Sequence, residues 1–191
     1  MARLKTCKQC RIRFVPDRPM QVCCSPLCAI DYGRKQSAIK AARKALAERR
    51  AARLKREVMK TRTEWMKDAQ RAFNAYIRER DKDKPCICCG LPLGNGDVGG
   101  SFDCGHYRSV GSAPHLRFDE RNAHAQRKQC NRYGAGRAVD YRIGLIGRIG
   151  SERVEILEAD NEPRKYSIEE LKTIISTYKQ KARELKNENR N

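Results

Sequence analysis

The chain has 191 residues, enough for one compact domain with extensions but too few for a large enzyme core. Its 42 lysines and arginines outnumber 23 aspartates and glutamates, which gives a formal net charge of +19. A field of this sign attracts polyanions, so nucleic acid is the expected partner, with ribosomes or a lipid surface as alternatives. No apolar run approaches the ~20 residues that span a bilayer, and the first residues lack a signal-peptide core. We therefore expect a protein of the reducing cytoplasm that does not enter a membrane.

The ten cysteines fall into an N-terminal group and a central group. In a reducing compartment, close Cys-x-x-Cys pairs favour tetrahedral zinc over disulfides. In the N-terminal group, one knuckle carries Cys7 and Cys10 and a second carries Cys24 and Cys28, with Cys23 left spare. Two such knuckles can close one four-cysteine site. The sequence therefore predicts a zinc-binding knuckle domain over residues 1–30, which contacts either DNA or protein.

The next segment, residues 31–63, is rich in alanine, lysine and arginine. From Ala29 to Arg62, twelve basic residues face three acidic ones. This composition favours a helix, but its apolar positions are too sparse for a globular core face: Ile39, Leu46, Leu54 and Val58. We predict an exposed basic helical arm, which is either a solvated spacer or a surface that lies along phosphates.

The pattern changes at Trp65, where apolar residues begin to recur at helical spacing: Trp65, Ala69, Ala72, Phe73, Tyr76 and Ile77. We predict that this helix packs in a core and ends near Asp81, before Pro85. It opens a core domain over residues 64–150. Near the end of that domain, glycines interrupt an apolar stretch from Val139 to Ile149.

A C-terminal helical extension is expected over residues 151–191. Ser167 and Glu170 have the spacing of a capping box, which predicts a helix start. The apolar positions that follow are Leu171, Ile174, Ile175 and Tyr178. We interpret this helix as structural.

The central cysteines carry the second predicted zinc site. Cys86 and Cys89 form a knuckle, with Gly90 permitting its tight turn, and Cys130 returns some forty residues later to the same ion. Such a site would pin together the ends of a unit made of a hairpin and a helix.

Within this unit, His106 follows Phe102, Asp103 and two small residues, as expected at the end of a short strand where an imidazole faces a cleft. An imidazole with an ordinary pKa near ~6.5 can take a proton from water near neutral pH while that water attacks phosphorus. Cleavage of DNA also needs a hard cation, for which we expect Mg²⁺. Asn131 and Asp103 offer the carbonyl and carboxylate oxygens, although Asp103 could instead hold a turn.

These motifs resemble those of HNH (ββα-metal) endonucleases of the H-N-N variety: Cys-x-x-Cys, Gly-His106-Tyr, Glu-Arg-Asn122 and Cys-Asn131. More narrowly, nearly the whole chain resembles the NinG (Rap) recombination proteins of lambdoid phages. The likeness includes the N-terminal knuckles, the segment over residues 76–81 and the segment over residues 116–122. The resemblance implies an α+β, mostly helical fold with a small ββα-metal core. It also implies an endonuclease that acts on D-loops and Holliday junctions and leaves 5′-phosphate ends.

The resemblance carries residue roles with it. His106 falls at the base position and Asn131 at the metal position. Asn122 falls at the middle Asn, which usually braces the loop before the helix and which we include, with Asp103, in the catalytic set. Symmetric junctions also suggest a homodimer.

The chain departs from this pattern at one zinc ligand. NinG relatives commonly read Gln-Cys-x-x-Cys-Asn, but here Arg127 stands at the first of those cysteines. Our hypothesis is that Cys104, or less favourably Cys88 or His124, completes the site, and a three-cysteine site is the rival.

Arginines near the predicted site are either solvated or bound to phosphate, and we assign four to DNA binding: Arg108, Arg121, Arg132 and Arg137. His115 and His124 are interpreted as surface or packing residues. Two other functions stay open. One is a zinc-dependent nucleic-acid-binding module without cleavage, and the other is a ribosome-associated zinc protein.

Overall fold

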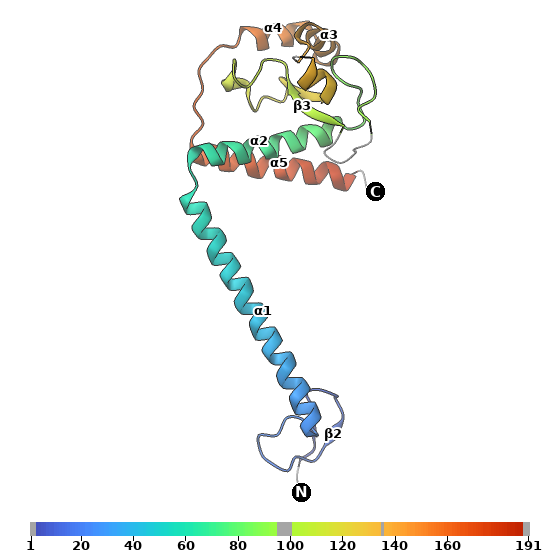
Figure 1. The fold of residues 1–191 in the computed structure, drawn as a ribbon, viewed down its shortest axis with the longest axis vertical. Coiled ribbons are helices and arrows are strands. Elements are labelled where there is room, and N and C mark those ends of the chain that lie inside the picture. Colours follow the sequence, from blue (N-terminus) through green and yellow to red (C-terminus); the bar gives the residue numbers. More distant parts are fainter. Residues whose placement is uncertain (1–2, 95–100, 135, 189–191) are drawn as a thin grey trace. The chain divides into compact units, whose positions relative to one another are not determined.

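The computed structural model describes residues 3–94, 101–134 and 136–188 (Figure 1). The gaps fall within three of the four predicted segments, of which only the described residues are discussed. The chain divides into two compact units, residues 1–60 and residues 61–191. Both are built mainly from helices, with one small two-stranded sheet in each, which agrees with the expected mostly helical α+β class.

The first unit begins with a short antiparallel hairpin, in which β1 (Lys5–Thr6) pairs with β2 (Arg13–Phe14). Helix α1 (Pro26–Met59) follows the second knuckle. Ser25 caps the helix because its hydroxyl accepts from the Cys28 backbone N–H at 3.2 Å, and Pro26 fits the first helical position. The first turn of α1 is therefore part of the knuckle.

None of the residues of α1 is buried, which confirms the prediction of an exposed helix. The helix begins earlier than the predicted arm because the knuckle supplies its cap. Its ten Lys and Arg and its three acidic residues all lie on a solvated surface, where a few pairs form at helical spacing, such as Lys44 with Glu48. Pairs of this kind contribute little to stability, so the positive field of the helix is largely preserved.

The second unit opens with α2 (Arg62–Asp81), which begins at a capping box formed by Thr61 and Glu64. All six apolar positions predicted for its core face are buried. The helix ends at Asp81, as predicted. The hydrophobic spacing therefore located this core helix correctly.

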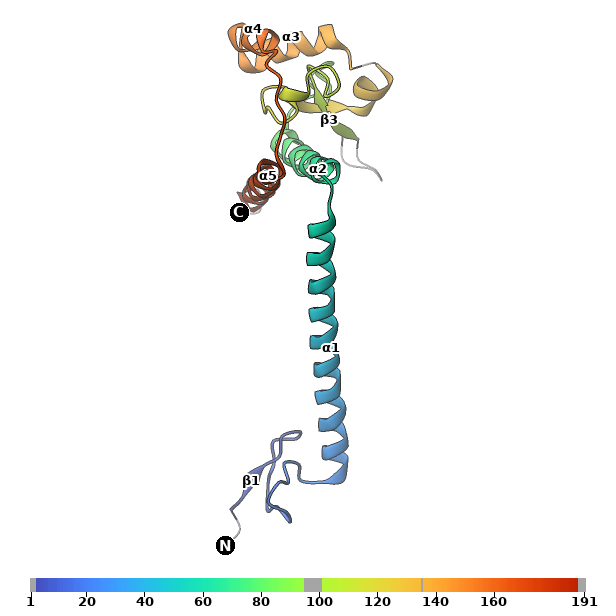
Figure 2. The same ribbon diagram turned by 90° about the vertical axis from the view of Figure 1, so that its left-hand side faces the viewer.

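Helices α2 and α5 (Ile168–Glu188) lie side by side and run in the same direction (Figures 1 and 2). Aromatic residues fill the space between them: the Phe73 and Tyr178 rings meet edge to face, with centroids 4.9 Å apart. The predicted capping box of α5 is present, since Ser167 Oγ accepts from the Glu170 N–H at 3.2 Å and Glu170 accepts from the Ser167 N–H at 2.8 Å. The C-terminal helix thus shares the core of α2.

The central hairpin packs on α2. In it, β3 (Phe102–His106) and β4 (Ala123–Arg127) are antiparallel, and His106 pairs with Ala123. His106 lies at the end of its strand, as the sequence predicted. A single wide helical turn, η2 (Gln129–Tyr133), follows β4 directly.

Helices α3 (Ala138–Ile149) and α4 (Ser151–Ala159) cover the other side of the hairpin (Figures 1 and 2). The glycine at position 144 does not break α3. A Cβ there would lie 1.8 Å from the Ile87 carbonyl oxygen, so Gly144 lets α3 approach the central knuckle closely. Tyr141 is fully enclosed on the same helix and donates to the Gly105 carbonyl at 3.0 Å.

A buried charge network joins α2 to the hairpin. The Asp81 side chain is fully buried and accepts from Arg80 at 2.7 Å, from Lys84 at 2.9 Å and from the Ala125 backbone N–H at 3.1 Å. Arg148 of α3 approaches it at 3.6 Å. Burial tends to raise the pKa of Asp81, but the hydrogen bonds it accepts outweigh burial and hold that pKa well below its usual range. The ionised carboxylate therefore fastens three elements together.

Candidate functional site

The N-terminal knuckles bring four thiols together. The Sγ atoms of Cys7, Cys10, Cys24 and Cys28 all lie within 4.8 Å of one another, as the spacing predicted. The hairpin turn carries the first two, and α1 carries Cys28 on its first turn. Cys23 is buried beside this cluster but does not belong to it.

The chemistry of this cluster suits zinc. Burial tends to raise the pKa of the Cys7 thiol, but hydrogen bonds from the backbone N–H groups of Cys10 and Cys24 outweigh it and lower that pKa to about 5. A thiolate is the form that binds metal. Four thiols converging in a segment too small to bury a core of its own fit a structural zinc site, in which the metal supplies part of the folding energy.

The central knuckle gives a second cluster, of three thiols. The Sγ atoms of Cys86, Cys89 and Cys130 lie within 4.8 Å of one another. The Cys86 pKa is lowered to about 4, mainly because the Cys88 thiol donates to Cys86, with further help from the backbone N–H of Arg127 at 3.3 Å from its Sγ. Cys130 comes from η2, so the cluster ties the end of the hairpin to the start of the knuckle. Three of the four ligands of a zinc site are thus in position.

The hypothesis that Cys104 completes this cluster is not supported. Cys104 packs in the apolar cluster of α2, with Phe73 and Ala123, and within the described residues it is not grouped with the three thiols. Its pKa is raised to about 12, chiefly by burial, which keeps the thiol protonated. His124 is no better placed, because its Nδ1 faces Arg80 at 3.1 Å.

His106 projects from the end of β3 and is held by a single backbone contact. Its Nε2 lies 3.1 Å from the Arg117 carbonyl oxygen. A carbonyl can only accept, so Nε2 carries the hydrogen and the lone pair of the neutral ring falls on Nδ1. Burial lowers the pKa of His106, against a smaller opposing effect of that carbonyl. The imidazole is therefore neutral at pH 7 and can accept a proton.

His106 and Asn131 line the same cavity, which has a volume of about 640 Å³. The other residues of its wall come from the loop after β3 and from the start of α3: Tyr107, Arg108, Ser109, Val110, Ser112, Gly136 and Ala138, together with Cys104. The cavity therefore joins the predicted base to the predicted metal-binding amide. Sequence reasoning missed the serines, because isolated serines in a loop carry no recognisable motif.

Asp103 lies beside Asn131. The Asn131 Nδ2 donates to the Asp103 carboxylate at 3.3 Å, so the two predicted oxygen ligands are neighbours. Arg132 also binds this carboxylate, at 2.8 Å through Nε and at 3.2 Å through a terminal nitrogen. The acid predicted to bind metal and an arginine predicted to bind DNA thus form an ion pair.

Asn122 braces a loop, as the resemblance implied, and its inclusion in the catalytic set stays a prediction. Its side chain is fully buried. Oδ1 accepts from the Arg108 N–H at 2.8 Å, while Nδ2 donates to the carbonyls of Arg108 at 3.0 Å and Leu116 at 3.2 Å. The amide therefore fixes both ends of the loop between His106 and Arg117.

The predicted DNA-binding arginines divide into two groups. Arg108 has partners within the protein, because its guanidinium donates to the carbonyls of Leu157, Glu158 and Asp160 at the end of α4. Carbonyls at a helix C-terminus attract a cation, so these contacts hold Arg108 against α4, and its role in DNA binding stays a prediction. The remaining three are half-exposed and form ion pairs: Arg121 with Asp119, Arg132 with Asp103, and Arg137 with Asp140.

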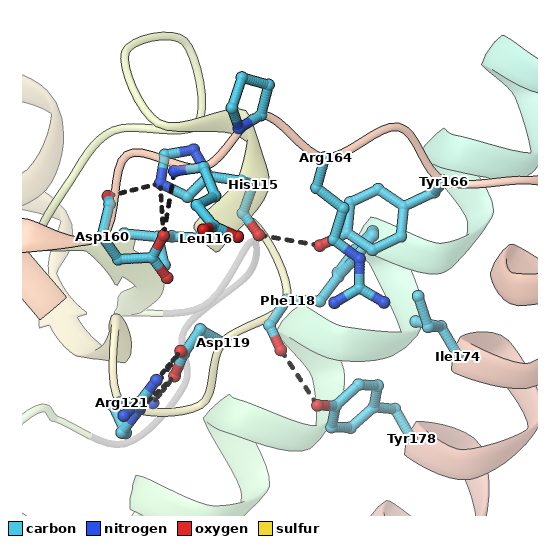
Figure 3. Close-up of a pocket in the computed structure, with 12 residues that line it drawn as sticks. His115, Leu116, Phe118, Asp119, Arg121, Asp160, Arg164, Tyr166, Ile174 and Tyr178 are labelled. Atoms are coloured by element: carbon cyan, nitrogen blue, oxygen red, sulfur yellow. Dashed lines mark hydrogen bonds and ion pairs between the residues drawn. The ribbon is translucent and has the colours of Figure 1, made fainter.

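A second cavity, of about 550 Å³, lies under the segment that joins α4 to α5 (Figure 3). His115 lines it and lies 2.8 Å from the Asp160 carbonyl oxygen, which agrees with its interpretation as a packing residue. The hydroxyls of Tyr166 and Tyr178 donate to the carbonyls of His115 at 2.9 Å and Phe118 at 3.2 Å. These contacts hold the loop whose Arg117 carbonyl orients His106.

None of the described helices is both long enough and apolar enough to cross a bilayer.

Comparison with known proteins gives a consistent result. Residues 1–188 match the family model described as Bacteriophage Lambda NinG protein. Protein ninG of Escherichia phage lambda is 39% identical over 196 residues, which cover 96% of this chain and 94% of the relative. Protein ninG of Salmonella phage P22 is 38% identical over 195 residues, with coverages of 95% and 94%. Protein ninG of Escherichia phage 933W is 43% identical over 135 residues, which cover 71% of this chain. The match spans 65% of the length of that relative.

No solved structure matches the chain significantly. The family model nevertheless covers both cysteine clusters and the cavity that His106 lines. This chain therefore belongs to the bacteriophage lambda NinG protein family.

Proposed function

We propose that this protein is an HNH-type, metal-dependent DNA endonuclease that acts on branched recombination intermediates. The observation that carries the proposal is the cavity shared by His106 and Asn131. It supplies a proton acceptor and an oxygen ligand within one space, on a hairpin braced by thiols. The order of β3, β4 and the helical turn η2 is the order that a ββα-metal centre requires.

His106 would act as the general base. With Nε2 donating to the Arg117 carbonyl, Nδ1 is free to take the proton from the water that attacks phosphorus. The carbonyl also stabilises the imidazolium that forms. Asn122 would act as a positioning residue, because it holds the loop that carries this carbonyl.

Asn131 and Asp103 would hold Mg²⁺. One amide and one carboxylate make a sparse oxygen set, which suits an ion that keeps several waters and uses substrate phosphate as a ligand. When bound, the ion would offset the charge that develops on the phosphate and the leaving oxygen. Asp103 would then share its charge between the ion and Arg132, and the weaker ion pair would leave the guanidinium partly available to a DNA phosphate.

The basic helix α1 would add affinity without sequence preference. It carries ten Lys and Arg against three acidic residues, and each phosphate that it neutralises releases counterions. Two copies of the chain could serve the two strands of a symmetric junction. Branched DNA is proposed as the substrate because the chain resembles the NinG (Rap) recombination proteins.

An alternative function is a zinc-dependent module that binds branched DNA without cutting it. The ion pair between Asp103 and Arg132 favours it, because this pair satisfies the carboxylate without metal. The second thiol cluster is also short of one ligand.

Incubation of the purified protein with a Holliday junction separates the two functions. We expect cleavage with Mg²⁺, no cleavage with EDTA, and 5′-phosphate ends on the products. A linear duplex of the same sequence, as the control, should be cut more slowly. Tight binding of the junction without cleavage at any Mg²⁺ concentration would contradict the endonuclease proposal and favour the module.

The cleavage rate should depend on pH through His106. Because burial lowers the pKa of this imidazole below 6.5, the neutral base predominates at a lower pH than it would in a free histidine. We expect kcat/KM to rise with pH at acidic values, with a midpoint below 6.5, and then to level off. Junction binding, measured across the same range, separates protonation of the base from loss of affinity. A midpoint above 6.5 would assign the titration to another group.

A further inference from the structure

The second thiol cluster lacks an obvious fourth ligand within the described residues. Cys104 packs against α2, and His124 faces Arg80. Cys88 touches the cluster but is not grouped with its three thiols: its thiol donates to Cys86, and its Sγ accepts from the Gln126 side chain and lies 3.7 Å from the Gly136 carbonyl oxygen. Gln126 is itself buried and also donates to that carbonyl at 2.9 Å, so the contact is part of a fixed arrangement.

A cavity of about 420 Å³ opens onto two of the three cluster residues, Cys89 and Cys130. The rest of its wall includes Arg127, Tyr133 and Arg137, and Tyr133 is 85% exposed. A small molecule from solution could therefore reach the thiols without displacing a packed side chain. Structural zinc sites are closed by four protein ligands, whereas sites with three protein ligands keep a position for an exchangeable one.

We propose that Cys86, Cys89 and Cys130 form a three-thiolate zinc site whose fourth position is open and is taken by a neutral donor from solution. Three thiolates already give the divalent ion an excess of negative charge. A neutral oxygen or nitrogen donor, such as water or an imidazole, is therefore preferred over an anion. The nearby cations Arg127 and Arg137 would offset part of that excess.

The residue at position 127 explains why the fourth position of the zinc site is open. Its backbone N–H lies 3.3 Å from the Cys86 Sγ, so a short thiol side chain at position 127 would begin beside the cluster. The long guanidinium side chain instead lines the cavity. Arg127→Cys should therefore close the site, and Arg127→Ser should leave it open with the arginine removed.

Cobalt replacing zinc in the full-length protein can test this proposal. Thiolate-to-cobalt charge-transfer absorption reports how many thiolates bind, and the visible bands report the fourth donor. Imidazole is the probe, because it is a small neutral nitrogen donor. The first cluster keeps its four cysteines in every variant and contributes a constant background, and two bound metals per chain show that both sites are loaded.

We expect imidazole to shift the visible bands of the wild-type protein and of Arg127→Ser. Arg127→Cys should show no shift, a stronger charge-transfer band, and a metal affinity higher by roughly tenfold or more in competition with a chelator. Cys88→Ser should behave like the wild-type protein.

Two results would overturn the proposal. A wild-type spectrum that does not respond to imidazole would mean that the fourth position is closed. Loss of charge-transfer intensity in Cys88→Ser would identify Cys88 as the fourth ligand. Neither result depends on DNA cleavage, so the proposed nuclease function is tested separately.

Discussion

Replacing His106 by alanine is expected to reduce the rate of Holliday junction cleavage by about 10²–10⁴-fold while junction affinity is retained. The ring is the only proton acceptor that the proposed mechanism uses, and the Arg117 carbonyl orients its Nδ1. Affinity should persist because the proposed phosphate contacts would come from arginines and lysines elsewhere. Single-turnover cleavage and equilibrium binding of the same junction measure the two quantities independently.

His115→Gln is the matched control for this experiment. His115 lies in the cavity of Figure 3, where it contacts Asp160, and it does not line the cavity of His106 and Asn131. We expect its cleavage rate to stay near that of the wild-type protein. If His106→Ala is folded and cuts the junction at the wild-type rate, the assignment of the base is wrong.

Replacing Asp81 by alanine is expected to lower the free energy of unfolding by about 3–5 kcal/mol. Arg80 and Arg148 are mostly buried, and the substitution removes the carboxylate that they share. Removing one partner of a buried ion pair is far more destabilising than removing a surface ion pair. Urea unfolding followed by the fluorescence of Trp65, the single tryptophan, measures this effect in the second unit.

Glu184→Ala is the control for Asp81, because Glu184 is exposed on α5 and bonds only to Gln180 among the described contacts. It should change the free energy of unfolding by less than about 0.5 kcal/mol. The pKa of Asp81 is lower in the folded protein than its ordinary value of 3.8. The ionised carboxylate therefore contributes to the free energy of unfolding above pH 3.8, and this contribution is lost as the pH falls below that value. Equal stabilities of the two variants at neutral pH would mean that the network is not stabilising.

The C-terminal segment, predicted to be only a structural extension, contacts the loop that orients His106. Tyr166 and Tyr178 anchor the carbonyls of His115 and Phe118, on either side of Arg117. Because the Arg117 carbonyl contacts His106, α5 and the segment before it hold the loop that orients this proposed base. These two contacts join residues that are 51 and 60 positions apart in the chain.

Several elements could be predicted from the sequence because their signals are local. The spacing of apolar residues after Trp65 located the core face of α2, and the capping box at Ser167 located the start of α5. The knuckle spacing grouped Cys7, Cys10, Cys24 and Cys28. Helix α4 falls within the predicted helical extension, but its bounds were not predicted because its nine residues have almost no amphipathic pattern.

The roles of individual side chains were harder to predict. Arg108 and Arg132 look alike in sequence, yet the first binds the end of α4 and the second binds Asp103. Cys104 lies between predicted zinc ligands in the sequence but packs on α2 in space. In the sequence, Gly144 suggests an interruption of the helix, whereas in the structure it allows the close approach of the Ile87 carbonyl to α3.

The sequence by itself determined the positive charge, the two cysteine groups, the core helices and the candidacy of His106 and Asn131. These depend on composition and on spacing over a few residues, which hold in any arrangement of the elements. Only the tertiary structure decided that His106 and Asn131 share a cavity, that the second cluster has three thiols, and that Asn122 and α5 hold the loop that contacts His106. Those facts depend on contacts between distant segments, and such contacts are set by packing of the whole unit rather than by any local pattern.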